Sequence, residues 1–153
     1  MTRTPVDVDS GIVADTAEAA SRSLVAWGLV AVWSLAVCIA HFGGLAYRTY
    51  WQIAWWDVLT HTAAGLGVAA ILYLLRPDLY RSPVALFVAL PLTVLAIGAG
   101  FEVYERVFRT FWHSWSVAYY VEDTVIDLVM DTAGALALSV LVVLVRAVRR
   151  VTD

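Results

Sequence analysis

Six ionisable side chains occur in pairs within apolar stretches of this 153-residue sequence, and the spacing within each pair fits one face of a helix. The pairs are Asp57 with His61, Glu102 with Glu105, and Asp127 with Asp131. Residues three or four positions apart lie one turn apart on the same side of an α-helix. An ionisable residue inside a membrane span costs about 3 kcal/mol or more, so it normally faces a protected interior or a water-filled cavity. The three pairs therefore predict one shared polar site inside a bundle of helices.

These side chains have the chemistry of a divalent-metal site. Carboxylate oxygens and imidazole nitrogens bind divalent cations, and carboxylates held close together cannot all stay ionised without compensation. We expect Mg²⁺, Mn²⁺ or Zn²⁺ as the ion and His61 and Asp57 as catalytic residues, with His61 acting as a ligand or as a general base. The predicted metal ligands are Asp57, His61, Glu102, Glu105, Asp127 and Asp131.

Three residues near these pairs are assigned structural roles. His41 precedes two glycines and is expected to be a hydrogen-bonded core histidine. Asp123 is expected to cap a helix that begins at Thr124. Pro91 is consistent with either a kink or a proline tolerated within a membrane helix. A haem between His41 and His61 is the least favoured alternative, because no other haem signal accompanies the pair.

The composition indicates an integral membrane protein. Apolar residues make up 61% of the chain and charged residues 15%, against roughly 45–50% and 25% in soluble proteins. The formal net charge of −3 leaves no basic patch for a nucleic-acid partner. Residues 1–20 are polar and acidic, which predicts a cytoplasmic tail rather than a cleaved signal peptide, and residues 21–150 form the membrane domain.

Four apolar runs are long enough to cross a hydrocarbon core, which takes about 20 helical residues. Short connections between successive spans predict an all-α, four-helix up-down bundle. The expected spans are residues 24–47, 57–75, 84–106 and 124–146.

Arginine placement predicts the orientation of this bundle, because cytoplasmic flanks are enriched in positive residues. The tails and the middle loop contain Arg3, Arg22, Arg76, Arg81, Arg146, Arg149 and Arg150, whereas the opposite side contains Arg48, Arg106 and Arg109. Both termini are therefore expected in the cytoplasm. At 1.5 Å per residue, the intramembrane His61, Glu102, Asp127 and Asp131 would lie about 5–12 Å below the outer hydrocarbon boundary.

Small residues follow the polar layer along the last three spans, and they predict close helix packing at mid-membrane with a bundle that opens outward. They are Ala63, Gly65 and Gly67, then Gly98 and Gly100, then Ala133, Gly134 and Ala135.

The ordered motifs resemble the VanZ-like membrane proteins and the related YjdF-type, DUF2238-like family. The resemblance rests on DVLTH from Asp57, EVYE from Glu102 and DLVMDTAGA from Asp127. It departs from the family pattern at Val58, where lysine is usual, and at Glu105 and Asp131, which replace glutamine and asparagine. Each departure makes the site more negative. The resemblance implies a multi-pass protein of the cell membrane concerned with the cell envelope.

Three functions stay open at this point. The first is a divalent-metal-dependent activity on a lipid or lipid-linked envelope substrate at the outer leaflet. The second is proton or cation translocation through the acidic ladder of the last span. The third is a non-catalytic membrane subunit or scaffold. The expected partners are the lipid bilayer, a lipid-linked substrate and further copies of the chain in a homo-oligomer.

Overall fold

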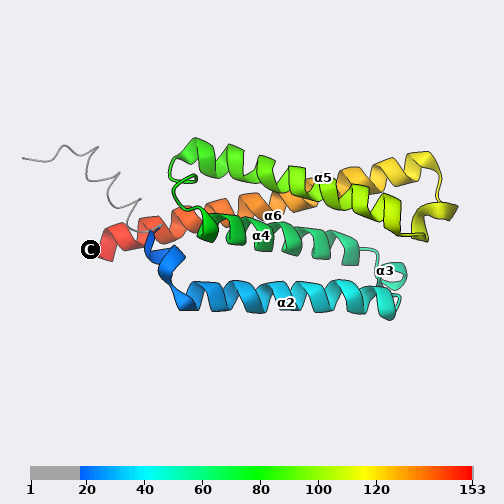
Figure 1. Ribbon diagram of the computed structural model, residues 1–153, viewed down its shortest axis with the longest axis horizontal. Helices are drawn as coiled ribbons and strands as arrows, with labels where there is room; N and C mark the ends of the chain where they lie inside the picture. The colour runs from blue at the N-terminus through cyan, green and yellow to red at the C-terminus, as the bar shows by residue number, and fades with distance from the viewer. Residues whose placement is uncertain (1–17, 153) are drawn as a thin grey trace, which may run out of the picture.

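The computed structural model describes residues 18–152, and within this range every regular element is helical. The long helices lie roughly along one common direction, with α4 between α2 on one side and α5 and α6 on the other (Figure 1). Four helical segments have the length and hydropathy to cross a membrane. These observations confirm the predicted all-α, four-span membrane architecture. The elements are α2 (Leu24–Ala46), α3 (Thr49–Gln52), α4 (Trp56–Leu75), η1 (Ala85–Ala89), α5 (Leu90–Phe108), η2 (Phe111–Ser114) and α6 (Val117–Thr152).

The closest packing joins α4 and α6, and two glycines permit it. A Cβ atom on Gly65 would overlap the backbone of Asp131, and one on Gly134 would overlap the carbonyl oxygen of Thr62. Small residues at such a crossing let two backbones approach, which is the main source of attraction between helices in lipid. Gly100 has open space around its Cα. The prediction that Gly100 takes part in close packing is therefore wrong.

The span formed by η1 and α5 contains a proline whose position explains an irregular turn. Ala85–Ala89 is a π-helical turn in which the Leu90 N–H donates to the Ala85 carbonyl oxygen. Pro91 follows immediately and is buried. A proline ring collides with the carbonyl group four residues earlier, and a wider turn at that place relieves the collision. The proline thus accounts for the π turn at the beginning of the span.

Helix α6 begins at Val117, earlier than the residue 124 expected from the apolar run. The Ser116 hydroxyl accepts a hydrogen bond from the Tyr119 N–H at 3.1 Å and supplies the cap. Asp123 lies inside the helix, so the prediction that it caps α6 is wrong. At 1.5 Å per residue, the 36 residues of α6 extend about 54 Å, well beyond a hydrocarbon core of about 30 Å.

The apolar core lies away from the acidic pairs, where α4, η1, α5 and α6 meet. Leu86, Leu90 and Val94 are almost completely buried there. The Ser139 hydroxyl donates to the Leu86 carbonyl oxygen at 2.6 Å, which ties α6 to the π turn. In contrast, α2 buries only Gly44 and leaves most of its apolar surface exposed. The bundle is therefore tight at the core and loose along α2.

At the end of the bundle beyond this core, a buried arginine hydrogen-bonds to α4 and to the loop that follows it. Arg146 on α6 is 7% exposed, and its guanidinium donates to the Tyr80 and Arg81 carbonyl oxygens and to the Tyr73 hydroxyl. These acceptors belong to α4 and to the loop that follows it. The arginine thus joins the α4–η1 connection to the last helix.

Candidate metal centre

The candidate site is centred on His61, which lies between carboxylates of α4 and α6. Its Nε2 atom is 3.6 Å from Oδ1 of Asp57, one turn earlier on α4, and 3.7 Å from Oδ1 of Asp127 on α6. Its Nδ1 atom is 3.4 Å from Oδ1 of Asp131, one turn further along α6. The close approach of α4 and α6 at the neighbouring Gly65 and Gly134 brings these two helix faces together.

Three of these groups are close enough to share one ion. One ligand atom each from Asp57, His61 and Asp127 lies within 4.8 Å of the other two. Asp127 is 4% exposed, so this carboxylate is buried inside the bundle, whereas the Asp57 side chain is 34% exposed. The site is therefore accessible from the side of Asp57, near the start of α4.

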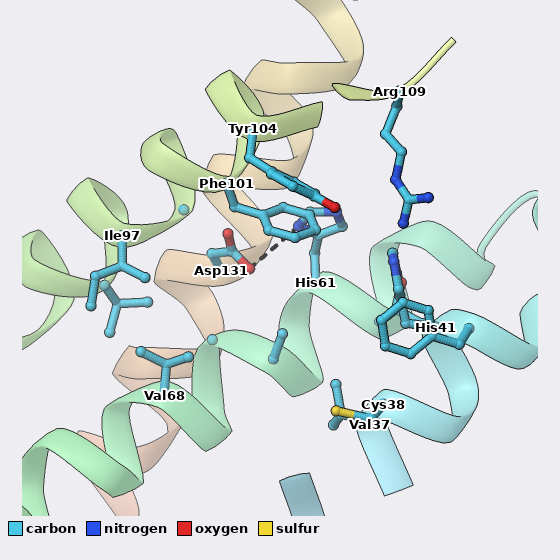
Figure 2. Close-up of a pocket in the computed structure, with 16 residues that line it drawn as sticks. Val37, Cys38, His41, His61, Val68, Ile97, Phe101, Tyr104, Arg109 and Asp131 are labelled. Atoms are coloured by element: carbon cyan, nitrogen blue, oxygen red, sulfur yellow. Dashed lines mark ion pairs between the residues drawn. The ribbon is translucent and has the colours of Figure 1, made fainter. Parts of the chain in front are cut away.

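Asp131 occupies the other side of the imidazole ring, and Figure 2 shows its ion pair with His61. A Cβ atom on Gly98 of α5 would overlap the Asp131 carboxylate. Gly98 thus leaves room for a carboxylate, a role that sequence reasoning missed because it assigned the glycine to helix packing. The one sequence signal that could have indicated this role is that Gly98 lies one turn before Glu102 on the same span.

Glu102 and Glu105 lie on α5, outside the group of three ligand atoms. Glu102 is 7% exposed, and its Oε2 atom accepts a hydrogen bond from the Thr124 hydroxyl at 3.0 Å. Its Oε1 atom has no hydrogen-bond partner among the described residues. Glu105 is half-buried one turn further along α5. Metal ligation by either glutamate stays a prediction.

Thr124 is a further residue that sequence reasoning missed as part of the site. It binds Glu102 from a position one turn before Asp127, which places it on the acidic side of α6. That i, i+3 spacing was the signal that could have identified it.

A second polar chain connects α2, α3 and α4. Nδ1 of His41 is 2.8 Å from the Tyr50 hydroxyl, which is 3.2 Å from the Thr60 hydroxyl. Burial raises the pKa of Tyr50 to about 12, and the neighbouring carboxylates act in the same direction, so the phenol keeps its proton. The expectation of a hydrogen-bonded His41 is confirmed.

A cavity of about 550 Å³ lies beside His61. Its polar wall includes His41, His61, Asp131 and Arg109, and the rest is mostly apolar. Figure 2 shows the Arg109 side chain extending from the end of α5 toward His41, with Ile97 and Val68 at the opposite end of the cavity. His61 is thus shared by the carboxylate cluster and the cavity.

The helical fold and this cluster define a class: a multi-pass α-helical membrane protein with a histidine and carboxylates inside its bundle. Within that class, residues 16–148 match the family described as "Predicted membrane protein (DUF2238)", and the chain belongs to that family. Comparisons with curated proteins and with solved structures give no significant match. The family match agrees with the DUF2238-like part of the expected resemblance, while the VanZ-like part stays a prediction.

Proposed function

We propose that Asp57, His61 and Asp127 bind a divalent metal ion that serves a reaction on a lipid or lipid-linked envelope substrate. The observation that carries the proposal is the convergence of three ligand atoms within 4.8 Å, partly enclosed between two membrane helices. A cation at this point would offset the repulsion between Asp57 and Asp127 and the cost of burying the second carboxylate.

The position of Asp131 beside Nδ1, the other ring nitrogen of His61, supports this assignment. A histidine that ligates a metal usually donates its second ring N–H to a carboxylate or carbonyl group, which fixes the tautomer and the ring orientation. The 3.4 Å approach of Asp131 to Nδ1 is consistent with that arrangement and leaves Nε2 directed toward Asp57 and Asp127. We therefore assign Asp131 as a positioning residue, although the spacing of α6 alone suggested a direct ligand.

The three proposed ligands indicate which metal ion the site would prefer and which chemistry that ion could support. One imidazole nitrogen and two carboxylates suit Zn²⁺ or Mn²⁺ better than Mg²⁺, which prefers oxygen ligands and retains several waters. Three protein ligands leave coordination positions free for water or substrate, as in catalytic metal sites. A bound ion would polarise a phosphoryl or ester group there.

A second candidate is proton transfer, because His61 has carboxylates at both ring nitrogens. Such a ring can exchange a proton on either side. However, residues 64–75 of α4 and residues 85–101 of the following span contain no aspartate, glutamate or histidine. A titratable path across the membrane is therefore interrupted on the far side of the cluster, which favours the metal proposal.

Metal binding is tested on detergent-purified protein stripped with a chelator. A ligand that binds only the folded state raises its unfolding midpoint with increasing concentration. We expect Zn²⁺ or Mn²⁺ to raise the wild-type midpoint by several degrees and Asp127→Asn to remove the rise. Glu122→Gln is the matched control, since it removes the same charge from an exposed position on the same helix.

Metal content of the purified variants gives a second readout. Equal content in wild type and Asp127→Asn, together with no ion-dependent shift in the wild type, would overturn the metal proposal. The proton-transfer and scaffold alternatives would then remain.

A further inference from the structure

The cavity beside His61 has walls on two helices that flank α4. Val37 and His41 contribute from α2, and Ile97 and Phe101 contribute from α5. Both helices pack against α4 rather than closely against each other, and they lie on opposite sides of it in Figure 1. Because α2 leaves most of its apolar surface exposed, the cavity is positioned to communicate with bilayer lipid between α2 and α5.

A positive charge lies at the polar end of this cavity. The Arg109 guanidinium points into the cavity (Figure 2), and its buried Nε atom has no hydrogen-bond partner among the described residues. This guanidinium lies 6.0 Å from the centroid of the Tyr104 ring, and Arg109 forms no ion pair within the part of the chain that the structure describes, which includes Glu105 one turn earlier. A partly buried cation requires an anion or hydrogen-bond acceptors to offset its desolvation. Arginine binds phosphate in a bidentate geometry that meets this requirement.

The residues that line the cavity from α5 extend over a length comparable with one lipid leaflet. Arg109 follows the end of α5 and therefore lies at the membrane boundary of that span. Ile97 is twelve residues earlier, which corresponds to roughly 18 Å along a helix. The hydrocarbon of one leaflet is about 15 Å thick, half of a typical core. A phosphate at Arg109 would thus place its hydrocarbon chain along the apolar wall toward Val68 and Ile97.

We propose that this cavity binds one hydrocarbon chain of a lipid and that Arg109 binds the phosphate of its headgroup. The lipid reaches the cavity from the bilayer between α2 and α5. This inference deepens the proposed function and rests on it in one respect: the bound lipid is taken as the substrate of the proposed reaction, and its cavity shares His61 with the metal centre. Lipid binding itself does not require the metal.

The test uses the full chain in neutral detergent with chelator present, and hexadecyl phosphate as the probe. Binding is measured by titration calorimetry, with hexadecanol and inorganic phosphate as comparison ligands. We expect hexadecyl phosphate to bind most tightly, because only this probe engages both Arg109 and the apolar wall. We expect Arg109→Gln to weaken it about tenfold or more, as loss of a charge-assisted hydrogen bond does. Arg48→Gln is the matched control, since it removes one exposed positive charge from the same end of the bundle.

A second pair of variants tests the location of the chain. Ala64 lines the cavity, whereas Val103 on α5 is 63% exposed and does not line it. Ala64→Phe should abolish binding of hexadecyl phosphate, and Val103→Phe should leave it unchanged. Ile97→Trp, which narrows the same cavity from α5, replaces Ala64→Phe if that variant does not fold.

The outcomes separate this inference from the metal proposal. Unchanged affinity in Arg109→Gln, retained binding in the folded cavity variant, or equal binding of inorganic phosphate would overturn the lipid site. Loss of the metal-dependent shift with intact lipid binding would overturn only the metal centre. A variant such as Arg109→Gln that loses lipid affinity and keeps its metal response would support both.

Discussion

At the scale of single residues, the position of His61 between three carboxylates is the decisive feature. Two of them approach Nε2 and the third approaches Nδ1. Aspartates one turn apart on α6 therefore have different roles in the proposed metal centre, although their spacing makes them look equivalent. In that proposal, Asp127 shares the ion with His61 and Asp131 fixes the orientation of the ring.

This difference predicts unequal effects of two otherwise identical substitutions. Asp131→Asn keeps the shape and an acceptor oxygen near Nδ1, so we expect metal affinity to fall by about 10–100-fold, as for other outer-shell partners of a metal-ligating histidine. Asp127→Asn should cause a larger loss, because it replaces a direct ligand. Titration of each apo variant with Zn²⁺ or Mn²⁺ gives the comparison. Equal losses would indicate that both aspartates ligate the ion.

At the scale of helices, the crossing of α4 and α6 determines whether the site forms. Gly134 faces backbone atoms of Thr62 and Leu66, which cannot move aside as a side chain can. Gly67 instead faces the indole of Trp33, whose Nε1 donates to the Ala63 carbonyl oxygen at 2.9 Å and joins α2 to α4. The two contacts therefore differ in how well they tolerate an added methyl group, although both glycines were predicted to lie at close helix packing.

Glycine-to-alanine substitutions measure this tolerance directly. Alanine favours a helix over glycine by about 1 kcal/mol, so any loss of stability must come from the added methyl group. Gly134→Ala should lower the unfolding midpoint in detergent, Gly67→Ala should have a smaller effect, and Gly100→Ala should be neutral or stabilising because its surroundings are open. Similar midpoints for Gly134→Ala and Gly100→Ala would contradict the close crossing.

The sequence predicts where the helices lie along the chain better than which face each helix turns toward its neighbours. Hydropathy identified the four spans, and i, i+4 spacing showed that Asp57 shares a face with His61. Spans that are apolar almost all round give little information about which face meets which neighbour. For that reason the bond between Glu102 and Thr124 was not anticipated. The early start of α6 at Val117 was missed because the apolar run begins only at residue 124, although the Ser116 cap was present in the sequence.

At the scale of the whole molecule, charge asymmetry between the two ends of the bundle predicts how it lies in the membrane. The beginning of α2, the α4–η1 connection and the end of α6 lie at one end of the bundle in Figure 1. That end includes Arg76 and Arg81, together with the buried Arg146. At the other end, the Arg106 guanidinium lies 3.3 Å from the centroid of the Trp112 ring, an aromatic contact suited to an interface.

Reporter fusions test this orientation in cells. An enzyme reporter fused after Asp153 and one placed before Leu24 should both show a cytoplasmic location, while one inserted near Ser114 should show the outside. Arginine enrichment at the end formed by the beginning of α2, the α4–η1 connection and the end of α6 is the physical reason for this expectation. The His61 cluster and Arg109 would then serve the outer leaflet, where a lipid-linked envelope substrate is accessible. The reverse reporter pattern would place the same cluster and the same cavity at the inner leaflet, so the candidate substrates would become lipids with headgroups that face the cytoplasm.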